Sequence, residues 1–226
     1  MMLNIIKKNK YEATGKGSST TTALCTANTS KVSALVWDGK NNPGQESSYT
    51  RQEVGLLASE SGAYTPGVTY TCELGDNESN TFYVLEENGD NVSLIAGFNL
   101  EGTVAWCKSG NANSCAADGA KAALKERTSG WTKLTESQIS LPSANQIATS
   151  AGRTFNGNSV SGLPTWLSSY TKTPVAHGYW TSTPYASDSS LAWIVIYDGH
   201  LSNSSVDYSG SYGVRPVITV SKSQLG

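Results

Sequence analysis

The sequence predicts an α+β fold made of antiparallel sheets, two short helices and long loops. Short runs of β-branched and aromatic residues alternate with turn-forming clusters, a pattern typical of strands joined as hairpins. Two other stretches carry the periodicity and capping residues of short helices. The chain also contains 22 glycines and only 15% charged residues, a composition typical of an ordered globular protein with many loops.

A chain of 226 residues is long enough to bury one core and carry a small appendage. We predict a Ser/Thr/Gly-rich N-terminal appendage with weak β structure over residues 1–62 and a main domain over residues 63–226. Within the appendage, residues 12–31 are either a linker or a weakly packed β segment. The run VSALVW at 32–37 predicts a strand, and a turn-rich loop follows at 38–49.

We predict that the main domain consists of strands, then two short helices, then further strands. The helix at 115–127 has Asp118 as its expected N-cap, and the helix at 141–150 has Ser143 as N-cap with Gln146 three residues later, which forms a capping box. A long loop separates these helices from the last strands. We expect strands at VTYTCEL (68–74), TFYVLEE (81–87), NVSLIAGFNL (91–100), GYWTSTPY (178–185), LAWIVIY (191–197) and GVRPVITV (213–220).

Charge and hydropathy exclude several classes of partner. A net charge of −2 and a pI near 5.7 give no basic surface for nucleic acid or for acidic lipids. The sequence has no apolar run of the roughly 18 residues that a bilayer span needs. We therefore predict neither nucleic-acid binding nor a direct membrane span.

The four cysteines fit neither a CxxC pair nor a Cys/His zinc set. Cys107 and Cys115 flank a Gly- and Asn-containing stretch that lets the chain turn back, so we predict a short disulfide loop, which leaves Cys25 to pair with Cys72. Disulfides imply an oxidising compartment and thus an extracellular or cell-surface protein. No export signal is visible, because residues 1–15 lack the apolar core of a signal peptide.

The most unusual stretch lies between residues 190 and 217. It begins and ends apolar, but from Tyr197 to Tyr212 it consists mostly of Ser, Asp, Asn, Gly and Tyr, without lysine or arginine. Exposed tyrosines among small polar residues resemble the composition of antibody paratopes, in which Tyr gives large contact area with few rotatable bonds. The alternative is an ordinary solvated hairpin, since the same polar residues are common in turns.

Several short sequence motifs in the chain resemble those of a known family. ISLPSANQI (139–147), GYWTSTPY, AWIVIYDG (192–199) and the closing GVRPVITVS (213–221) resemble the C-type-lectin-like fold in its bacterial form. That form is shared by the formylglycine-generating-enzyme superfamily and by the variable proteins of bacterial and phage diversity-generating retroelements. The resemblance covers residues 64–222 and implies a C-type-lectin-like fold with a hypervariable C-terminal ligand-binding surface.

The resemblance also implies which residues contact a ligand and which are fixed by packing. Alternation along the strand would place Trp193 and Val195 in the core and display Ile194 and Ile196 on the opposite face. If both isoleucines belong to the core instead, the displayed set shrinks to the residues after Tyr197. The candidate ligand-binding residues are Tyr185, Ser187, Asp188, Ser190, Ile194, Ile196, Tyr197, Asp198, His200, Ser202, Asn203, Ser205, Asp207, Tyr208 and Tyr212.

The expected function is non-enzymatic binding of a protein or glycan on another cell or particle, with no cofactor and no metal. Formylglycine-generating enzymes use a cysteine pair in their C-terminal half, whereas this chain has no cysteine after Cys115. The triplets of calcium-dependent sugar-binding lectins are also missing. The main alternative is a structural or adhesive surface paralogue without a variable site, and an oxidase of the formylglycine-generating type is a remote one. We expect Trp180 and Trp193 in the core and Arg215 as a structural hydrogen-bond hub.

Overall fold

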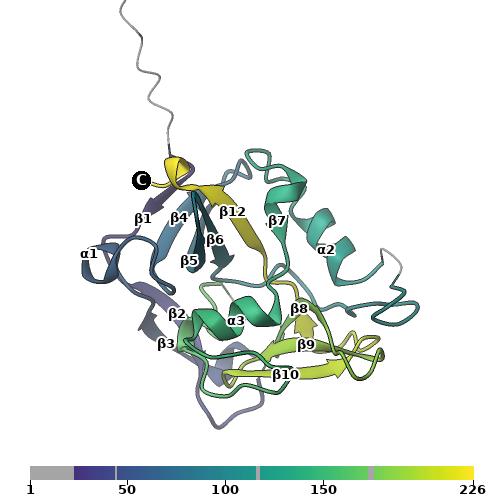
Figure 1. Cartoon of the computed structure of the whole chain (residues 1–226). Helices are drawn as coiled ribbons and strands as arrows, with labels where there is room; N and C mark the ends of the chain where they lie inside the picture. The colour runs from purple at the N-terminus through teal and green to yellow at the C-terminus, as the bar shows by residue number, and fades with distance from the viewer. Residues whose placement is uncertain (1–22, 44, 116–117, 173–175) are drawn as a thin grey trace, which may run out of the picture.

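The computed structural model describes residues 23–43, 45–115, 118–172 and 176–226. They form an α+β fold of a six-stranded sheet, a four-stranded sheet and a separate two-stranded hairpin, with short helices between the sheets and at their sides (Figure 1). None of the described helices has the length and apolar composition that a membrane span requires.

The six-stranded sheet is antiparallel and contains most of the strands predicted in the first half of the domain. Strand β12, from the C-terminal end of the chain, inserts between β6 and β7 and so closes this sheet. The predicted hairpins β4–β5 and β5–β6 are confirmed. In spatial order the strands are β1 (Cys25–Ala27), β4 (Thr69–Glu73), β5 (Ser79–Asn88), β6 (Asn91–Ala96), β12 (Val217–Ser221) and β7 (Ile139–Ser140).

Strand β5 is buried on both faces because the sheet has core on either side. Phe82 and Val84 pack into one apolar cluster, while Tyr83 and Leu85 pack into the other. This follows from the alternation of side chains along a strand. The first cluster continues toward helix α2 and the second toward helix α3, so β5 lies at the centre of the molecule.

The four-stranded sheet carries the segment that the sequence singled out. Strands β9 and β10 form the predicted hairpin, which turns at Gly199 with a φ of 79°. The predicted core residues Trp180 and Trp193 are confirmed as buried. The spatial order is β10 (His200–Ser205), β9 (Leu191–Ile196), β8 (Gly178–Pro184) and β11 (Tyr212–Gly213).

The helices are short, and one of the two predicted caps is confirmed. Ser143 caps α3 (Ala144–Ser150) and forms the capping box with Gln146. Helix α2 (Ala120–Arg127) has Gly119 at its N-cap, so the prediction of Asp118 as the cap was wrong. Gly119 packs so tightly on the Trp106 carbonyl that a Cβ would clash, and Asp118 instead accepts hydrogen bonds from the Lys108 amide and the Ser109 hydroxyl. The remaining helical elements are α1 (Ala58–Ser61), η1 (Glu46–Ser48), η2 (Glu136–Gln138), η3 (Thr165–Leu167) and η4 (Lys222–Gln224).

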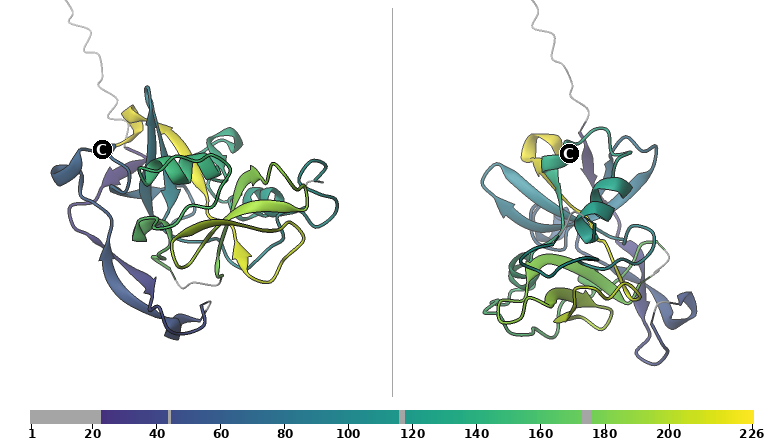
Figure 2. Two further views of the ribbon diagram at one scale, coloured as in Figure 1. Left: turned by 60° about the horizontal axis from the view of Figure 1, so that its bottom comes forward. Right: turned by 90° about the vertical axis from the view of Figure 1, so that its right-hand side faces the viewer.

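The predicted N-terminal appendage contributes directly to the domain in its described part. Strand β1 pairs with β4 in the main sheet, and both predicted disulfides, Cys25–Cys72 and Cys107–Cys115, are present. Strands β2 (Val32–Trp37) and β3 (Tyr49–Val54) form a hairpin that extends from the body (Figure 2). The appendage's first 22 residues lie outside the described residues.

Arg215 is the structural hub that its apolar strand context predicted. The residue is fully buried, and its guanidinium donates to the carbonyls of Ala96, Leu167 and Trp166 at 2.5, 2.7 and 3.0 Å. The same group lies over the ring of Tyr179, 5.1 Å from the ring centroid. Carbonyl oxygens and an aromatic face therefore replace the water that a buried guanidinium loses.

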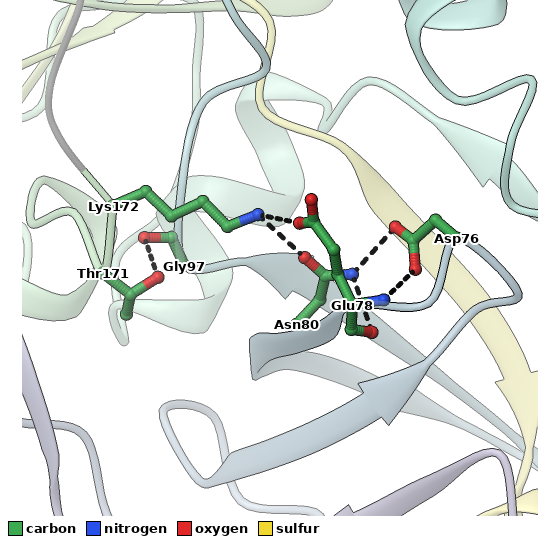
Figure 3. A network of polar contacts seen from close by, with 6 residues as sticks. All are labelled: Asp76, Glu78, Asn80, Gly97, Thr171 and Lys172. Carbon is green, nitrogen blue, oxygen red and sulfur yellow. Dashed lines mark hydrogen bonds and ion pairs between the residues drawn. The ribbon is translucent and has the colours of Figure 1, made fainter.

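A polar network fastens the loop after η3 to the start of β5 (Figure 3). Lys172 pairs with the Glu78 carboxylate at 2.6 Å and donates to the Asn80 side chain at 3.2 Å. Asn80 is itself held by the Asp76 carboxylate at 3.0 Å. These groups satisfy one another, and the network holds the loop in place.

Candidate ligand-binding surface

The predicted ligand-binding residues lie around the four-stranded sheet but do not share one face of it. The exposed ones lie in the loop before β9, in the β9–β10 turn, at the first residue of β10 and just after β10, and most of the rest are half-buried along β9, β10 and β11. The exposed group is Ser187, Asp188, Ser190, Asp198, His200, Asp207 and Tyr208; the half-buried group is Tyr185, Ile196, Tyr197, Ser202, Asn203, Ser205 and Tyr212; Ile194 is buried.

The prediction that Ile194 is displayed was wrong, since only 2% of the residue is exposed. Side chains do alternate along β9, but both faces are covered. Trp193 and Val195 pack into one core cluster, while Ile194 packs into the other together with Trp180. Ile196 and Tyr212 lie at the margin of the cluster that contains Ile194. The physical reason is that the chain after β10 folds back over this face, with Val206 and Val214 buried there.

Tyr185 and Asn203 belong to the opposite face of the sheet. Asn203 lies across from Trp193 in the β9–β10 register, and residues that face each other in an antiparallel pair project to the same side. Tyr185 contacts the same Trp193 with ring centroids 5.4 Å apart, and Phe155 covers it from another side at 5.0 Å. These residues therefore form a separate group, apart from the tyrosines after β9.

The loop at residues 187–190 is ordered by local hydrogen bonds and by the disulfide loop. Asp188 accepts from the amide and the hydroxyl of Ser190 at 2.8 and 2.7 Å, and these bonds lower the pKa of its carboxyl group. The carbonyl of Ser189 accepts from the Ala112 amide, which lies within the Cys107–Cys115 loop, at 2.7 Å. This loop thus borders the disulfide loop.

Aromatic side chains from three parts of the chain form two neighbouring contact groups at the four-stranded sheet. The Tyr197 ring lies 4.7 Å from that of Trp37 and 6.2 Å from that of His177. The second group is Tyr208 and Tyr212, whose ring centroids are 6.0 Å apart. A backbone hydrogen bond of 2.6 Å from the His177 amide to the Ser211 carbonyl links the chain segments that carry the two groups. We call Trp37, His177, Tyr197, Tyr208 and Tyr212 the aromatic cluster.

Within the aromatic cluster, the ring of Tyr212 is half-buried and that of Tyr208 is exposed. Burial raises the pKa of Tyr212, and the nearby Tyr208 and Tyr197 add to this effect, against a hydrogen bond from Ser204. Tyr208 is 48% exposed and is one of two large apolar side chains that stand out from the described surface, the other being Leu56. Its hydroxyl shares a hydrogen bond with Ser211 at 3.0 Å, which fixes the ring in position.

Polar groups accompany the aromatic cluster along the β9–β10 hairpin. His200 Nδ1 and Asp198 Oδ1 are 2.8 Å apart across the Gly199 turn. Ser205 donates to the Asp207 carboxylate at 2.6 Å where β10 ends. The hairpin therefore offers a row of hydroxyl, carboxylate and imidazole groups that can exchange their present partners for those of a ligand.

Trp37 and His177 are the members of the aromatic cluster that the sequence prediction missed. Trp37 ends a strand of the predicted appendage and is far from Tyr197 in the sequence, so only the folded hairpin brings them together. The position of His177 directly before the GYW phrase was the available signal for that residue. The paratope-like composition did identify Tyr197, Tyr208 and Tyr212.

A family model described as a domain of unknown function, DUF6273, matches residues 108–222. This segment is more than half of the 226-residue chain. The chain belongs to the DUF6273 family. No curated protein and no solved structure matches it.

The DUF6273 segment contains every member of the aromatic cluster except Trp37. Cys107, Cys115 and Asp118 lie close enough together to be considered as a metal site. Cys115 and Asp118 belong to the matched segment, and Cys107 directly precedes it. Both sulfur atoms of that group are joined in a disulfide. They cannot act as thiolate ligands in this state, so the group is not a metal site as it stands in this DUF6273 protein.

Proposed function

We propose that this DUF6273 protein is a non-enzymatic ligand-binding protein with a C-type-lectin-like fold. Its ligand would be a protein or glycan on another cell or particle, bound by the aromatic cluster and the polar edge of the β9–β10 hairpin. The observation that carries this proposal is the aromatic cluster itself, in which two neighbouring groups of exposed and half-buried rings lie beside the β9–β10 hairpin.

The chemistry of the aromatic cluster suits recognition. Tyrosine and tryptophan supply large contact areas at little entropic cost, and interface hot spots are enriched in both. Tyr208 is exposed, whereas its neighbour Tyr212 is half-buried against Trp180, so an exposed ring is supported by a packed one. Asp198, His200 and the β10 serines would provide the directional hydrogen bonds that fix the orientation of a ligand.

We further propose that the segment from Tyr185 to Tyr212 is a diversifiable surface, as in retroelement variable proteins. Within this segment Ala192, Trp193, Val195, Leu201 and Val206 are all buried and would form its fixed framework. All of the candidate ligand-binding residues except Ile194 are exposed or half-buried. Exchange at exposed positions changes contacts with a ligand while the packed positions keep the hairpin in shape.

The disulfides support an extracellular or cell-surface location, because such bonds persist in oxidising compartments. They also bear on the oxidase alternative. An enzyme of the formylglycine-generating type needs a redox cysteine pair in its C-terminal half. All four cysteines of this chain lie at or before residue 115, which favours the non-enzymatic proposal over this alternative.

Binding assays on matched surface variants test the proposal. Fluorescently labelled protein is applied to a glycan array and to intact bacterial and host cells, and the Tyr208→Ser variant is compared with Leu56→Ser. Both positions are exposed and apolar, but only Tyr208 belongs to the aromatic cluster. We expect Tyr208→Ser to weaken binding by about tenfold or more, as hot-spot substitutions do, and Leu56→Ser to leave binding unchanged.

The same experiment separates this proposal from the surface-paralogue alternative. A solvated hairpin without a binding role predicts equal binding by the Tyr208→Ser and Leu56→Ser proteins. The diversification hypothesis has its own test in the gene sequences of many isolates. Substitutions should concentrate between residues 185 and 212 at adenine-derived codons, whereas substitutions spread evenly along the gene would contradict it.

A further inference from the structure

We infer that the cleft between α2 and β7 binds a small organic anion with an apolar, ring-sized body. The cleft has a volume of about 730 Å³, and its lining residues come from α2, the loop after it, η2, β7, the first turn of α3 and the second half of β8. Pockets for small molecules commonly have about 300–1,000 Å³. None of the residues of the aromatic cluster lines it, so this site is separate from the proposed recognition surface.

The cleft exists because α2 is held away from β7 by the chain that connects them. The residue after the helix, Thr128, is its C-cap, and the Thr128 hydroxyl donates to the Leu124 carbonyl at 2.8 Å. The chain then turns through Trp131 and returns as η2 and β7, a strand of two residues whose partner is β12. Figure 1 shows α2 beside β7 with the connecting loop above them. An ion pair between Lys125 and Glu136, at 3.0 Å, spans the rim.

The inner wall of the cleft is apolar. Leu124, Trp131 and Leu141 belong to the main core cluster, and Leu134 and Ile139 pack against its margin. Trp131 is fixed from behind by Phe82, with ring centroids 6.0 Å apart. A rigid indole beside branched aliphatic groups favours a flat ring or a branched hydrocarbon as the ligand body.

Charge at the rim favours an anion. Three charged residues line the cleft, namely Lys121, Lys125 and Glu136. Lys125 and Glu136 neutralise each other, whereas Lys121 is exposed and has no ion-pair partner among the described residues. Ser140 and Ser182 also line the cleft, and their hydroxyls make no hydrogen bond within the described parts of the chain. A carboxylate can therefore take a salt bridge from Lys121 and hydrogen bonds from the serines.

Titration of the full chain with 1-naphthoate, followed by calorimetry and by NMR, tests the inference. We expect saturable binding with shift changes at Trp131 and along α2. The neutral amide of the same ring system should bind more weakly. The Lys121→Gln variant should lose about three- to fivefold in affinity, the range of an exposed ion pair. Lys108→Gln, at an exposed lysine outside the cleft, should bind as the unchanged protein does.

Filling the cleft provides an independent test. Ser140 is exposed on β7, so Ser140→Trp should leave the fold intact by circular dichroism and abolish naphthoate binding. Tyr208→Ser should leave naphthoate binding unchanged. The inference is overturned if naphthoate does not bind, if its binding survives Ser140→Trp in a folded protein, or if the amide binds equally well and Lys121→Gln and Lys108→Gln have the same effect.

Discussion

The indole ring of Trp37 meets the phenol ring of Tyr197 edge to face, with centroids 4.7 Å apart and planes inclined at 68°. This contact joins the β2–β3 hairpin to the end of β9. The hairpin is also tied to the domain by paired hydrogen bonds between Leu35 and Tyr170, at 2.7 and 3.0 Å. A segment outside the matched DUF6273 residues thus supplies one ring of the aromatic cluster.

Trp37→Ala should release the hairpin from the cluster. Aromatic pairs contribute about 0.5–1.5 kcal/mol beyond the burial of their area, so we expect a loss of roughly 1 kcal/mol in local stability. Hydrogen exchange should become faster in β2 and β3 while the six-stranded sheet stays protected. Trp37→Phe retains an edge-to-face ring and should change exchange much less. Equal acceleration throughout the molecule would show that the contact is not local.

Replacement of Arg215 should be among the most damaging substitutions. Arg215→Met removes the guanidinium donor from three buried carbonyls, of which that of Leu167 keeps its hydrogen bond from the Tyr179 hydroxyl, and we expect the free energy of unfolding to fall by about 3–5 kcal/mol. Arg215→Lys keeps the charge but cannot reach all three carbonyls with the planar guanidinium fork, so it should also destabilise strongly. Denaturation by urea measures both. Arg153→Met, at an exposed arginine, is the control and should change stability by less than about 0.5 kcal/mol.

The two disulfides should contribute unequally to stability. Cys25 and Cys72 are 47 residues apart, whereas Cys107 and Cys115 are 8 apart. Loop-closure entropy gives about 4 kcal/mol for the first and about 2.5 kcal/mol for the second. The double variant Cys25→Ser/Cys72→Ser should therefore unfold at lower urea concentration than Cys107→Ser/Cys115→Ser. The reverse order would show that the short loop stabilises the native packing around α2 more than it restricts the unfolded chain.

Stability should fall at high pH because buried tyrosines resist ionisation. Burial raises the pKa of Tyr179 to about 12, against the effect of the nearby Arg215, and also raises that of Tyr170. The unfolded chain loses these protons near pH 10, so stability is complete below that pH and declines above it. The expected loss from Tyr179 is about 2 kcal/mol by pH 12.

Urea unfolding between pH 8 and pH 12 measures this decline, and Tyr179→Phe is the matched control. The variant loses the hydrogen bond from Tyr179 to the Leu167 carbonyl, 2.9 Å long, and so starts from lower stability. Its decline with pH should nevertheless be shallower. An equally steep decline in both proteins would assign the pH dependence to other groups.

Local sequence patterns predicted most of the strands and one helix cap, because turn residues and capping boxes act over a few positions. Ser143 with Gln146 is an example, and so is the β9–β10 hairpin turning at Gly199. Asp118 was misjudged because the start of α2 depends on a tertiary contact, the close approach of Gly119 to Trp106. No local pattern contains that information.

The candidate site was predicted in part for the same reason. Composition identified the tyrosines after β9, but period-two alternation could not tell which face of the strand is covered. Ile194 is buried because a later segment folds over it, and Trp37 joins the cluster through a hairpin that precedes the domain. The α2–β7 cleft depends on the spacing of elements, which leaves no signature in any single stretch of sequence.

The segment that carries Tyr208 and Tyr212 is hydrogen-bonded at both ends to the chain between residues 100 and 107. The carbonyl of Val206 accepts from the Cys107 amide at 2.9 Å, and that of Val214 accepts from the Leu100 amide at 2.8 Å. Both valines are buried, and Arg215 follows at once. The ends of this stretch are therefore held at a fixed separation, so substitutions among the exposed residues 207–210 can change the side chains that it presents without moving its ends.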